Sequence, residues 1–419
     1  MTRSVTRTGK IKVIFLANKL GGGGAERSLL EVVKSLDRSR YDTELWRLSS
    51  ENFYPDYLDD LNKSEVLPSF ERSQKSTLRI KRCNSSLPRY LSSAGASRFI
   101  IDGLRLYDRL RHLLKITKYT PILVSSQLSM NACASVLQWL CSYRVPVIFI
   151  EQNEPYWRYT FGEPSHLRDL ALTKIRNLYP RANHVIAVSR ATKLSLVARF
   201  GIDCNRITVI PNPVDIKRVQ LHLNQPPPEH PFYKGRAPIL LCTARFSSQK
   251  NHQLLLRSFA LVRTRIPAKL ILLGHGEFRE MIKRSIQEMN LVNDVAIIDF
   301  QHNPFSYVAH SSLSLLSSYC EGHPLALLES LACGIPVVST NWKGATEIVR
   351  HGVNGIISKM TDQAFADGIM AGLNLSRISS TRLAAITTAT KFDISRITGK
   401  YENMLLAVAK SNGIEPVRL

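Results

Sequence analysis

The sequence has few of the features that mark disulfide-bonded, zinc-binding or membrane-spanning proteins. Its seven cysteines are odd in number and include no Cys-x-x-Cys pair. This argues against a disulfide framework or a zinc site and favours a reducing cytosol. No continuous apolar run reaches about 18 residues, and the first one, Ile11 to Asn18, is too short for a secretion signal. We therefore expect a cytoplasmic protein that is neither secreted nor membrane-spanning.

Acidic residues are also scarce, since 33 aspartates and glutamates face 56 lysines and arginines and give a net charge of +23. Such an excess suits an anionic partner: nucleic acid, an anionic membrane surface or a phosphorylated substrate. No zinc-finger spacing, RNP-like aromatic motif or helix-turn-helix signature is present, so nucleic acid is not the expected partner. No Asp-x-Asp motif calls for a metal, and we expect no cofactor.

The 419 residues are too many for one ordinary core and predict two domains. Short apolar runs alternate with helical patterns in both halves, which indicates parallel sheets covered on both faces. The expected strands are 11–16, 121–125, 147–151, 184–189 and 207–211, then 239–243, 269–273, 296–300, 312–316 and 336–340. The expected helices include 25–36, 253–265, 277–289 and 394–409. We place the first domain at 1–213, the second at 214–390, and a closing helix in 391–419 that returns to the first domain.

Glu321 is the first residue of the segment that contains the most candidate functional side chains. Its neighbours Gly322, His323 and Pro324 lead into a helical pattern over 325–333. Proline suits the first turn of a helix, where its missing N–H costs nothing. The free N–H groups and the positive dipole end at such a helix start form a site for phosphate.

Two carboxylates flank this expected helix start, Glu321 in the loop and Glu329 about one turn into the helix. Carboxylates accept hydrogen bonds from sugar and ribose hydroxyls. Beside a phosphate site, they indicate a ligand that is both phosphorylated and polyhydroxylated. The alternative is a capped, solvent-facing helix with two incidental acids.

Two further loops follow expected strands of the second half. Arg245 and Lys250 lie on the first of them, and fixed cations there can neutralise a departing diphosphate. The alternative for both is ordinary surface charge. Gly274 and Gly276 form a Gly-x-Gly turn on the second loop, which by itself is a weak signal.

Four consecutive glycines, 21–24, lie between the first strand and the first helix and are followed by Ala25, Glu26 and Arg27. Glycines without side chains let the backbone approach a ligand closely. The pattern is not Gly-x-Gly-x-x-Gly with a distant acid, so a dinucleotide fingerprint is poorly supported. A tight strand-to-helix turn is compatible with this role and does not compete with it.

Together these segments resemble the retaining family-4 glycosyltransferases of GT-B fold. The 321–329 stretch matches their E-x7-E motif, and 332–338 matches the A-x-G-x-P-V-V that follows it. Arg245 and Lys250 match an R-x4-K pair, and residues 23–27 match a G-G-A-E-R loop. Similar segments also occur at 187–193 and 209–215. The resemblance implies two Rossmann-like parallel-sheet domains that face each other across a cleft.

The resemblance also implies a role for each matched residue. Glu329 would bind the ribose hydroxyls, Glu321 would contact the donor sugar, and backbone N–H groups after Pro324 would bind the diphosphate. Arg245 and Lys250 would stabilise the leaving diphosphate, so the catalytic candidates are Glu321, Arg245 and Lys250. The candidates for nucleotide binding are Gly23, Gly24, Gly274, Gly276, Gly322, His323, Pro324, Leu325, Ala326 and Glu329.

This chain departs from the family pattern in two places. His323 stands where phenylalanine is commonest. Gln152 and Asn153 stand after the strand 147–151, where the family often has a histidine near the reacting sugar. Either amide can hydrogen-bond a sugar, but neither can take up a proton. This fits a mechanism in which the leaving phosphate accepts the acceptor's proton; Glu151 and Glu154 are weaker candidates for that role.

The sequence thus predicts a metal-independent, retaining hexosyltransferase. It would move a sugar from a nucleoside diphosphate sugar, with UDP the expected carrier, to a saccharide or lipid-linked acceptor in surface polysaccharide or glycolipid synthesis. A nucleotide-sugar epimerase of related architecture is the nearest alternative, and a basic nucleic-acid-binding protein is a more distant one.

A basic segment from Arg72 to Lys118 has twelve basic residues against two acidic ones. Apolar residues fall at helical spacing within it, among them Tyr107, Leu110 and Leu114. One interpretation is a core-facing helix with a solvated cationic face. The other is attraction to an anionic leaflet, with the apolar stripe entering the headgroup region. We expect a peripheral protein on the cytoplasmic face of a membrane.

Overall fold

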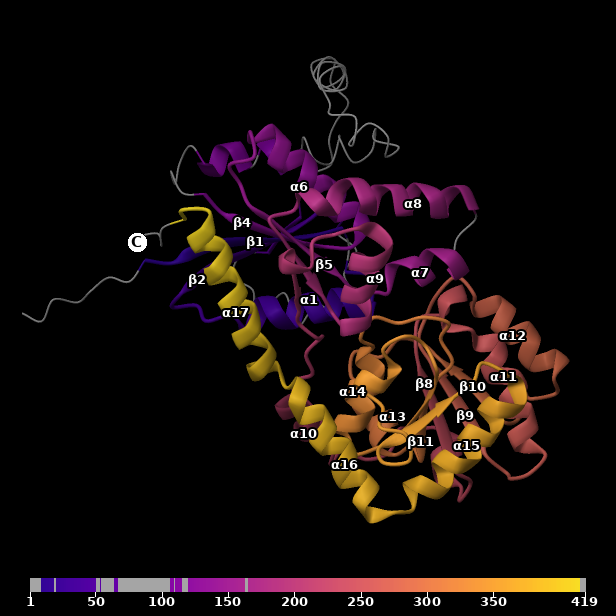
Figure 1. The fold of residues 1–419 in the computed structure, drawn as a ribbon. Helices are drawn as coiled ribbons and strands as arrows, with labels where there is room; N and C mark the ends of the chain where they lie inside the picture. Colours follow the sequence, from indigo (N-terminus) through magenta and orange to yellow (C-terminus); the bar gives the residue numbers. More distant parts are fainter. Residues whose placement is uncertain are drawn as a thin grey trace, which may run out of the picture.

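Two parallel sheets follow one another along the chain and form two lobes, as the computed structural model shows (Figure 1). The structure describes residues 9–18, 20–49, 53, 64–66, 106–108, 110–114, 120–162 and 165–414. In Figure 1 the first lobe is coloured mainly indigo to magenta, and the second runs from red-brown through orange to yellow. The predicted α/β class with two Rossmann-like sheets is therefore confirmed.

The first sheet has seven strands within the described ranges, in the order β3-β2-β1-β4-β5-β6-β7, and neighbouring strands are parallel. These strands are β1 (Ile11–Ala17), β2 (Tyr41–Arg47), β3 (Ser64–Val66), β4 (Ile122–Ser126), β5 (Val147–Glu151), β6 (His184–Ala187) and β7 (Ile207–Val209). Alternate side chains of β1 enter different cores. Phe15 packs with α1 (Gly24–Ser35), and Leu16 packs with α6 (Leu128–Leu140) on the opposite face.

The second sheet has the same plan with six strands in the described part of the chain, in the order β10-β9-β8-β11-β12-β13. They are β8 (Ile239–Thr243), β9 (Lys269–Leu273), β10 (Val295–Ile298), β11 (Leu313–Leu316), β12 (Val337–Thr340) and β13 (Gly355–Ser358). One face is covered by α13 (Phe305–Ala309), α14 (Leu325–Ala332) and α16 (Ser379–Ala389). The other is covered by α11 (His252–Arg263), α12 (Arg279–Glu288) and α15 (Asp362–Ser376). The expected strands and helices agree with these bounds to within a few residues.

Strand β2 was not predicted, because its sequence is rich in charge. The structure shows how that charge is accommodated. Lys12 of β1 lies beside β2, and its Nζ donates to Asp42 at 2.8 Å and to Glu44 at 2.5 Å. The Trp46 indole N–H donates to the other oxygen of Glu44 at 2.7 Å. Because the charges are paired between strands, a position between two other strands, β3 and β1, is compatible with the polar sequence of β2.

The chain crosses between the lobes twice, at adjacent points. Val214 leaves the first lobe and Asp393 returns toward it, and the two residues form a parallel β-bridge. Val214 N–H donates to Phe392 O at 2.9 Å, and Ile394 N–H donates to Val214 O at 3.0 Å. Helix α17 (Ile394–Ser411) then contributes Ile397, Tyr401 and Leu405 to the core of the first lobe. Figure 1 shows α17, in yellow, running alongside the first lobe.

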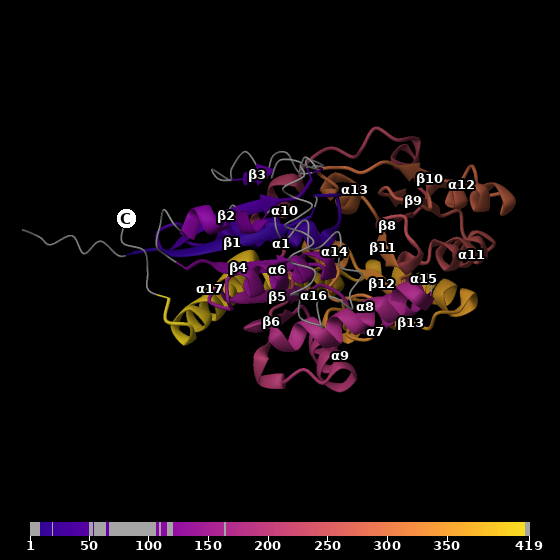
Figure 2. The same cartoon turned by 90° about the horizontal axis from the view of Figure 1, so that it is seen from above.

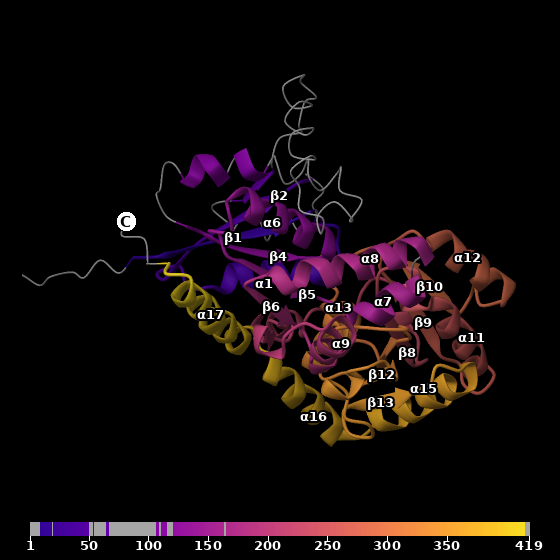
Figure 3. The same ribbon diagram turned by 45° about the horizontal axis from the view of Figure 1, so that its top comes forward.

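Further contacts join the lobes near the middle of the molecule. Helix α1 packs on α14 of the second lobe, and both lie at the junction when the molecule is seen from above (Figure 2). Helix α7 (Pro155–Gly162) packs on the short turn Ser248–Lys250, and Figure 3 shows α7 and α8 (Ser165–Leu178) reaching over the second lobe. Loops at the carboxyl ends of the two sheets are thereby held close together.

The basic segment between Arg72 and Lys118 lies mostly outside the described residues. Within it, 106–108 and 110–114 are helical. Leu110 is fully buried in the first lobe, and Tyr107 and Leu114 pack against the same core, whereas Arg111 is exposed. The expectation that this apolar stripe enters a membrane is wrong for these three positions, because the protein core already covers them.

Across the described ranges, no helix is both long and apolar enough to cross a bilayer.

Candidate active site

A cleft of about 560 Å³ lies between the carboxyl ends of the two sheets. Its walls are the loops that follow β1, β4 and β5 on one side and β8, β9, β10 and β11 on the other. In both sheets the strand order reverses at the centre, between β1 and β4 and between β8 and β11. Open parallel sheets bind ligands at such a crevice outside the carboxyl ends of their strands.

Most of the residues selected from the sequence line this cleft. They are Gly23, Gly24, Gln152, Asn153, Arg245, Lys250, Gly274, Glu321, His323, Pro324, Leu325, Ala326 and Glu329. They come from five different strand-to-helix connections of the two lobes, those after β1, β5, β8, β9 and β11, so the fold alone brings them together.

Gly276 and Gly322 were also expected to bind the nucleotide, but neither lines the cleft. A Cβ atom on Gly322 would lie 2.2 Å from the backbone oxygen of Gln152 in the other lobe. A Cβ atom on Gly276 would lie 2.3 Å from the backbone oxygen of Phe246. Both glycines are therefore required by close backbone packing of the loops that border the cleft.

Helix α14 begins where its sequence predicts, except that Pro324 lies just before the first turn and not within it. Pro324 is the N-cap, with φ −71° and ψ 120°, so it precedes the first turn of the helix, and Leu325 is the first helical residue. Leu325 and Ala326, the first two helical residues, line the cleft. Gly334 ends the helix with φ +76°, as expected for a glycine in the left-handed conformation. The helix start is therefore placed to bind an anion.

Glu321 is held by two groups at the floor of the cleft. Lys250 Nζ donates to its Oε1 at 2.5 Å, and Ser318 Oγ donates to the same oxygen at 2.6 Å. The Glu321 side chain is 6% exposed and that of Lys250 is 18% exposed. This partly buried pair places a fixed cation and a fixed carboxylate side by side, next to the start of α14.

Arg245 is more exposed than Lys250. Its side chain is 46% exposed, and Nη2 lies 3.5 Å from Glu277 Oε2. So long a contact between exposed groups is weak. The guanidinium is therefore available to an anionic ligand in the cleft.

Glu329 has a partner that sequence reasoning did not identify. Arg27 of α1, in the other lobe, makes an ion pair with Glu329 Oε1 through Nη2. Arg158 and Phe300 also line the cleft and were not selected. Arg27 lies in the recognised glycine loop motif, but no local pattern reveals that it faces a residue in the second half of the chain.

Glu151, a weaker candidate in the sequence, lines the cleft at the end of β5. Its Oε2 accepts from the Tyr179 hydroxyl at 2.6 Å, and Tyr179 accepts in turn from Asn131 Nδ2 at 2.9 Å. Burial, opposed by the Tyr179 hydrogen bond, raises the pKa of Glu151 to about 7. The adjacent Gln152 is buried, and neither polar atom of its amide has a hydrogen-bond partner among the described residues. A polar ligand would supply that partner.

The raised pKa of Glu151 predicts a specific pH dependence. As pH rises from 4.5 to about 7, the unfolded chain loses this proton before the folded chain does, so stability falls over that range. We expect Glu151→Gln to unfold at a higher temperature than wild type at about pH 8 and at a similar temperature near pH 4.5. The same change at the exposed Glu229 is the control. A difference between Glu151→Gln and wild type that stays constant with pH would contradict the assignment.

His323 behaves as an apolar residue. It is 3% exposed, and its ring packs against Phe392 with centroids 4.7 Å apart. Neither ring nitrogen has a hydrogen-bond partner within the described part of the chain, and burial lowers its pKa to about 3. Only its backbone takes part in a hydrogen bond, as the carbonyl accepts from Asn212 Nδ2 at 2.9 Å. This explains how histidine stands where the family commonly has phenylalanine.

We expect His323→Phe to raise the free energy of unfolding by about 1 kcal/mol near pH 7, because two unpaired buried nitrogens are removed. Since the folded-state pKa lies below the unfolded value, the wild-type histidine loses stability as pH falls from 6.5 toward 3. The advantage of phenylalanine should therefore grow at about pH 5. Urea unfolding at both pH values measures it. If His323→Phe were less stable than wild type at both pH values, the ring nitrogens of His323 would have hydrogen-bond partners after all.

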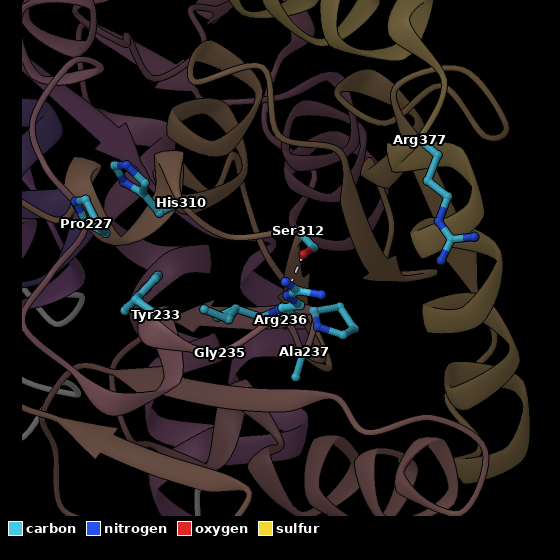
Figure 4. Close-up of a pocket in the computed structure, with 10 residues that line it drawn as sticks. Pro227, Tyr233, Gly235, Arg236, Ala237, His310, Ser312 and Arg377 are labelled. Carbon is cyan, nitrogen blue, oxygen red and sulfur yellow. Dashed lines mark hydrogen bonds between the residues drawn. The ribbon is translucent and has the colours of Figure 1, made fainter.

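No group of three or more metal-ligating side chains occurs among the residues that the structure describes. A separate hollow of about 390 Å³ lies by Ile239 and Ser312, at the amino ends of β8 and β11 (Figure 4). Arg236 and Arg377 lie on its walls, but Figure 4 shows their guanidinium groups well apart. This hollow is at the opposite end of the sheet from the cleft, so its residues are not part of the candidate site.

Comparison with known proteins agrees with this architecture. Residues 22–218 match the family model Glycosyltransferase Family 4, and residues 228–391 match the model Glycosyl transferases group 1. An uncharacterized glycosyltransferase of Methanocaldococcus jannaschii is 31% identical over 202 residues, which are 47% of this chain and 49% of the relative. The N-acetylgalactosamine-N,N'-diacetylbacillosaminyl-diphospho-undecaprenol 4-alpha-N-acetylgalactosaminyltransferase of Campylobacter jejuni is 30% identical over 187 residues, or 44% of this chain and 49% of the relative.

The chain thus spans about half the length of the curated relatives it matches. Similarity in fold extends further. The crystal structure of HepE from Anabaena in complex with UDP and glucose has a TM-score of 0.69 at 19% identity, covering 95% of this chain and 100% of that chain. The adjoining family matches and the two facing parallel sheets show that this chain belongs to the group 1 glycosyltransferases of family 4, with the GT-B fold.

Proposed function

We propose that this protein transfers a sugar from a nucleoside diphosphate sugar to a saccharide or lipid-linked acceptor, with retention of anomeric configuration. The observation that carries the proposal is the pair Lys250–Glu321 beside the amino end of α14, in the cleft between the lobes. The amino end of α14 and the Lys250 ammonium suit a diphosphate, and the Glu321 carboxylate suits hydroxyl groups.

Each residue has a chemical role in this proposal. The N–H groups of Leu325 and Ala326, with Lys250 and Arg245, bind the diphosphate and stabilise the charge that develops as it leaves. Glu329 accepts hydrogen bonds from the ribose hydroxyls, and Glu321 orients the sugar. These charges are fixed before the reaction, so little reorganisation is needed at the transition state.

The reaction exchanges one bond at the anomeric carbon. The bond to the diphosphate oxygen breaks, and a bond to the acceptor oxygen forms on the same face of the sugar. The proton of the acceptor hydroxyl passes to the departing phosphate oxygen. Gln152 and Asn153 provide amides for the sugar but cannot accept this proton, which supports a direct transfer to the leaving group. No metal is part of the proposal.

UDP is the proposed carrier, supported by its presence in the HepE complex. A screen of UDP-sugars and GDP-sugars by thermal shift tests the donor, because a ligand that binds the folded state raises its unfolding temperature. Turnover of the donor found should persist in EDTA. Full inactivation by EDTA, restored by Mg²⁺ or Mn²⁺, would contradict the metal-independent mechanism. Release of an epimerised free sugar from donor alone would favour an epimerase.

The acceptor is proposed from charge and from a relative. The Campylobacter relative carries diphospho-undecaprenol in its name, and this chain has a net charge of +23. A basic protein is attracted to an anionic leaflet, which is where a lipid-linked acceptor would lie. Since the described part of the apolar stripe is buried, this attraction is electrostatic. We therefore propose peripheral attachment to the cytoplasmic face of a membrane.

Binding to vesicles tests the attachment. We expect sedimentation with anionic vesicles to fall as salt increases. It should also weaken when Arg105, Arg109 and Arg111 are changed to Glu. The control changes Arg284, Arg350 and Arg377, exposed residues of the second lobe, to Glu, with the same alteration of net charge. An equal effect of the two triple variants, or equal binding to neutral vesicles, would contradict a surface centred on the basic segment.

A further inference from the structure

Arg27 and Glu329 come from opposite lobes and meet at the cleft. Arg27 lies in the second half of the glycine loop motif on α1, and Glu329 lies on α14. The Glu329 side chain is 5% exposed and that of Arg27 is 16% exposed. An unpaired carboxylate at this depth would be strongly disfavoured in its charged form. The contact with Arg27 therefore keeps Glu329 available as an ionised hydrogen-bond acceptor.

The backbone that carries Arg27 is fixed by neighbouring contacts on the same face of α1. Ser28 Oγ donates to Asn212 Oδ1 at 2.7 Å, and Asn212 Nδ2 donates to the His323 carbonyl just before α14. One turn later, Glu31 Oε1 lies 3.6 Å from Arg218 Nη1. These contacts hold α1 against the linker and the start of α14, so Arg27 approaches Glu329 from a rigid support.

Arg27 is poorly suited to bind the diphosphate itself. Its charge lies between two carboxylates, Glu329 across the cleft and Glu31 one turn along α1. Burial raises the pKa of Glu31, and Arg27 is the first of the charges that oppose this effect. A cation compensated on both sides offers little net attraction to a phosphate. Lys250 and Arg245, on the second lobe, are better placed for that role.

We propose that Arg27 is a positioning residue for nucleotide binding, which holds one carboxylate oxygen of Glu329 from across the cleft and leaves the other for the ribose hydroxyls. The inference rests on the proposed function, in which Glu329 binds ribose. In this proposal both lobes form the ribose site, because Glu329 belongs to the second lobe and Arg27, which orients it, belongs to the first.

The experiment compares a nucleotide that has ribose hydroxyls with one that lacks them. Isothermal titration of the full chain measures the affinity for UDP and for 2′,3′-dideoxy-UDP. We expect Arg27→Gln to weaken UDP binding by about tenfold or more, the effect of losing one well-placed polar interaction. The affinity for the dideoxy analogue should remain unchanged, because that ligand does not use Glu329.

Two further variants separate positioning from folding. Arg27→Lys should retain most of the UDP affinity, because a lysine ammonium can also form an ion pair with Glu329. Arg218→Gln is the matched control, since it removes an arginine that pairs with Glu31 on α1 and whose described ion pair does not involve Glu329. It should bind UDP as wild type does. Thermal unfolding without nucleotide checks that each variant is folded.

The outcomes distinguish this inference from the proposed function. Equal weakening of UDP and dideoxy-UDP in Arg27→Gln would overturn it, since Arg27 would then bind the diphosphate or support the fold in general. Unchanged UDP affinity in Arg27→Gln would overturn it as well, while the function proposed for Glu329 would stand. Failure of the wild-type protein to prefer UDP over the dideoxy analogue would instead contradict the ribose site, and the inference with it.

Discussion

Replacing Lys250 by alanine should lower turnover of the nucleoside diphosphate sugar by about 100-fold or more, the scale of losing one preorganised electrostatic contact at a transition state. Lys250 is partly buried, and its Nζ lies 2.5 Å from Glu321 Oε1. It therefore brings a fixed charge to the cleft, where screening by water is reduced. Arg245→Ala should also cost mainly turnover, and to a comparable extent.

Release of the nucleoside diphosphate from the sugar donor measures this loss. Lys283→Ala is the matched control, because Lys283 is 46% exposed on α12 and pairs only with the exposed Glu280 in the contacts described for it. Its turnover should equal that of wild type. Since Glu321 loses a buried partner in Lys250→Ala, thermal unfolding must show that the variant is folded at the assay temperature. Turnover within about threefold of wild type in a folded variant would rule out the proposed role of Lys250.

Replacing Glu329 by alanine should abolish tight nucleotide binding together with turnover. A carboxylate that accepts hydrogen bonds from two ribose hydroxyls contributes enough to weaken UDP binding by about 100-fold when it is lost. Glu321→Ala should behave differently. Glu321 faces the sugar in the proposed arrangement, so turnover should fall while UDP alone binds nearly as it does to wild type.

The contrast between these two glutamates is the test. Both are buried, both line the cleft, and both have a basic partner, so a general effect of removing a buried carboxylate would be similar in the two variants. Titration with UDP and donor turnover together separate binding from chemistry. Wild-type UDP affinity and activity in Glu329→Ala would remove the ribose assignment. Equal loss of UDP affinity in both variants would show that the roles are not divided as proposed.

The membrane prediction shows how a pattern can be correct and still be misassigned. Apolar residues do recur at helical spacing around Tyr107, Leu110 and Leu114, and the described part is helical. Periodicity reports that one face of a helix avoids water, but it does not say what covers that face. Here the core of the first lobe covers it. The basic charge of the segment is a separate observation, and the vesicle experiment tests that charge and its location.

The sequence by itself determined the features that depend on neighbouring residues. Pro324 and Gly334 bound helix α14 because both act through local backbone geometry, and the central strands were recognised because buried parallel strands are continuously apolar. Charged or glycine-rich loops at the ends of such strands supplied the candidates for the cleft, and the resemblance to the family-4 glycosyltransferases gave those candidates their expected roles.

Only the tertiary structure decided which of these residues meet. Gly322 was selected as a ligand-binding residue, yet its lack of a side chain is required by the backbone of Gln152 in the other lobe. Arg27 pairs with Glu329 although most of the chain separates them. Ion pairs and close approaches between lobes depend on how two independently patterned sheets are placed in space, and the periodicity of neither sheet contains that information.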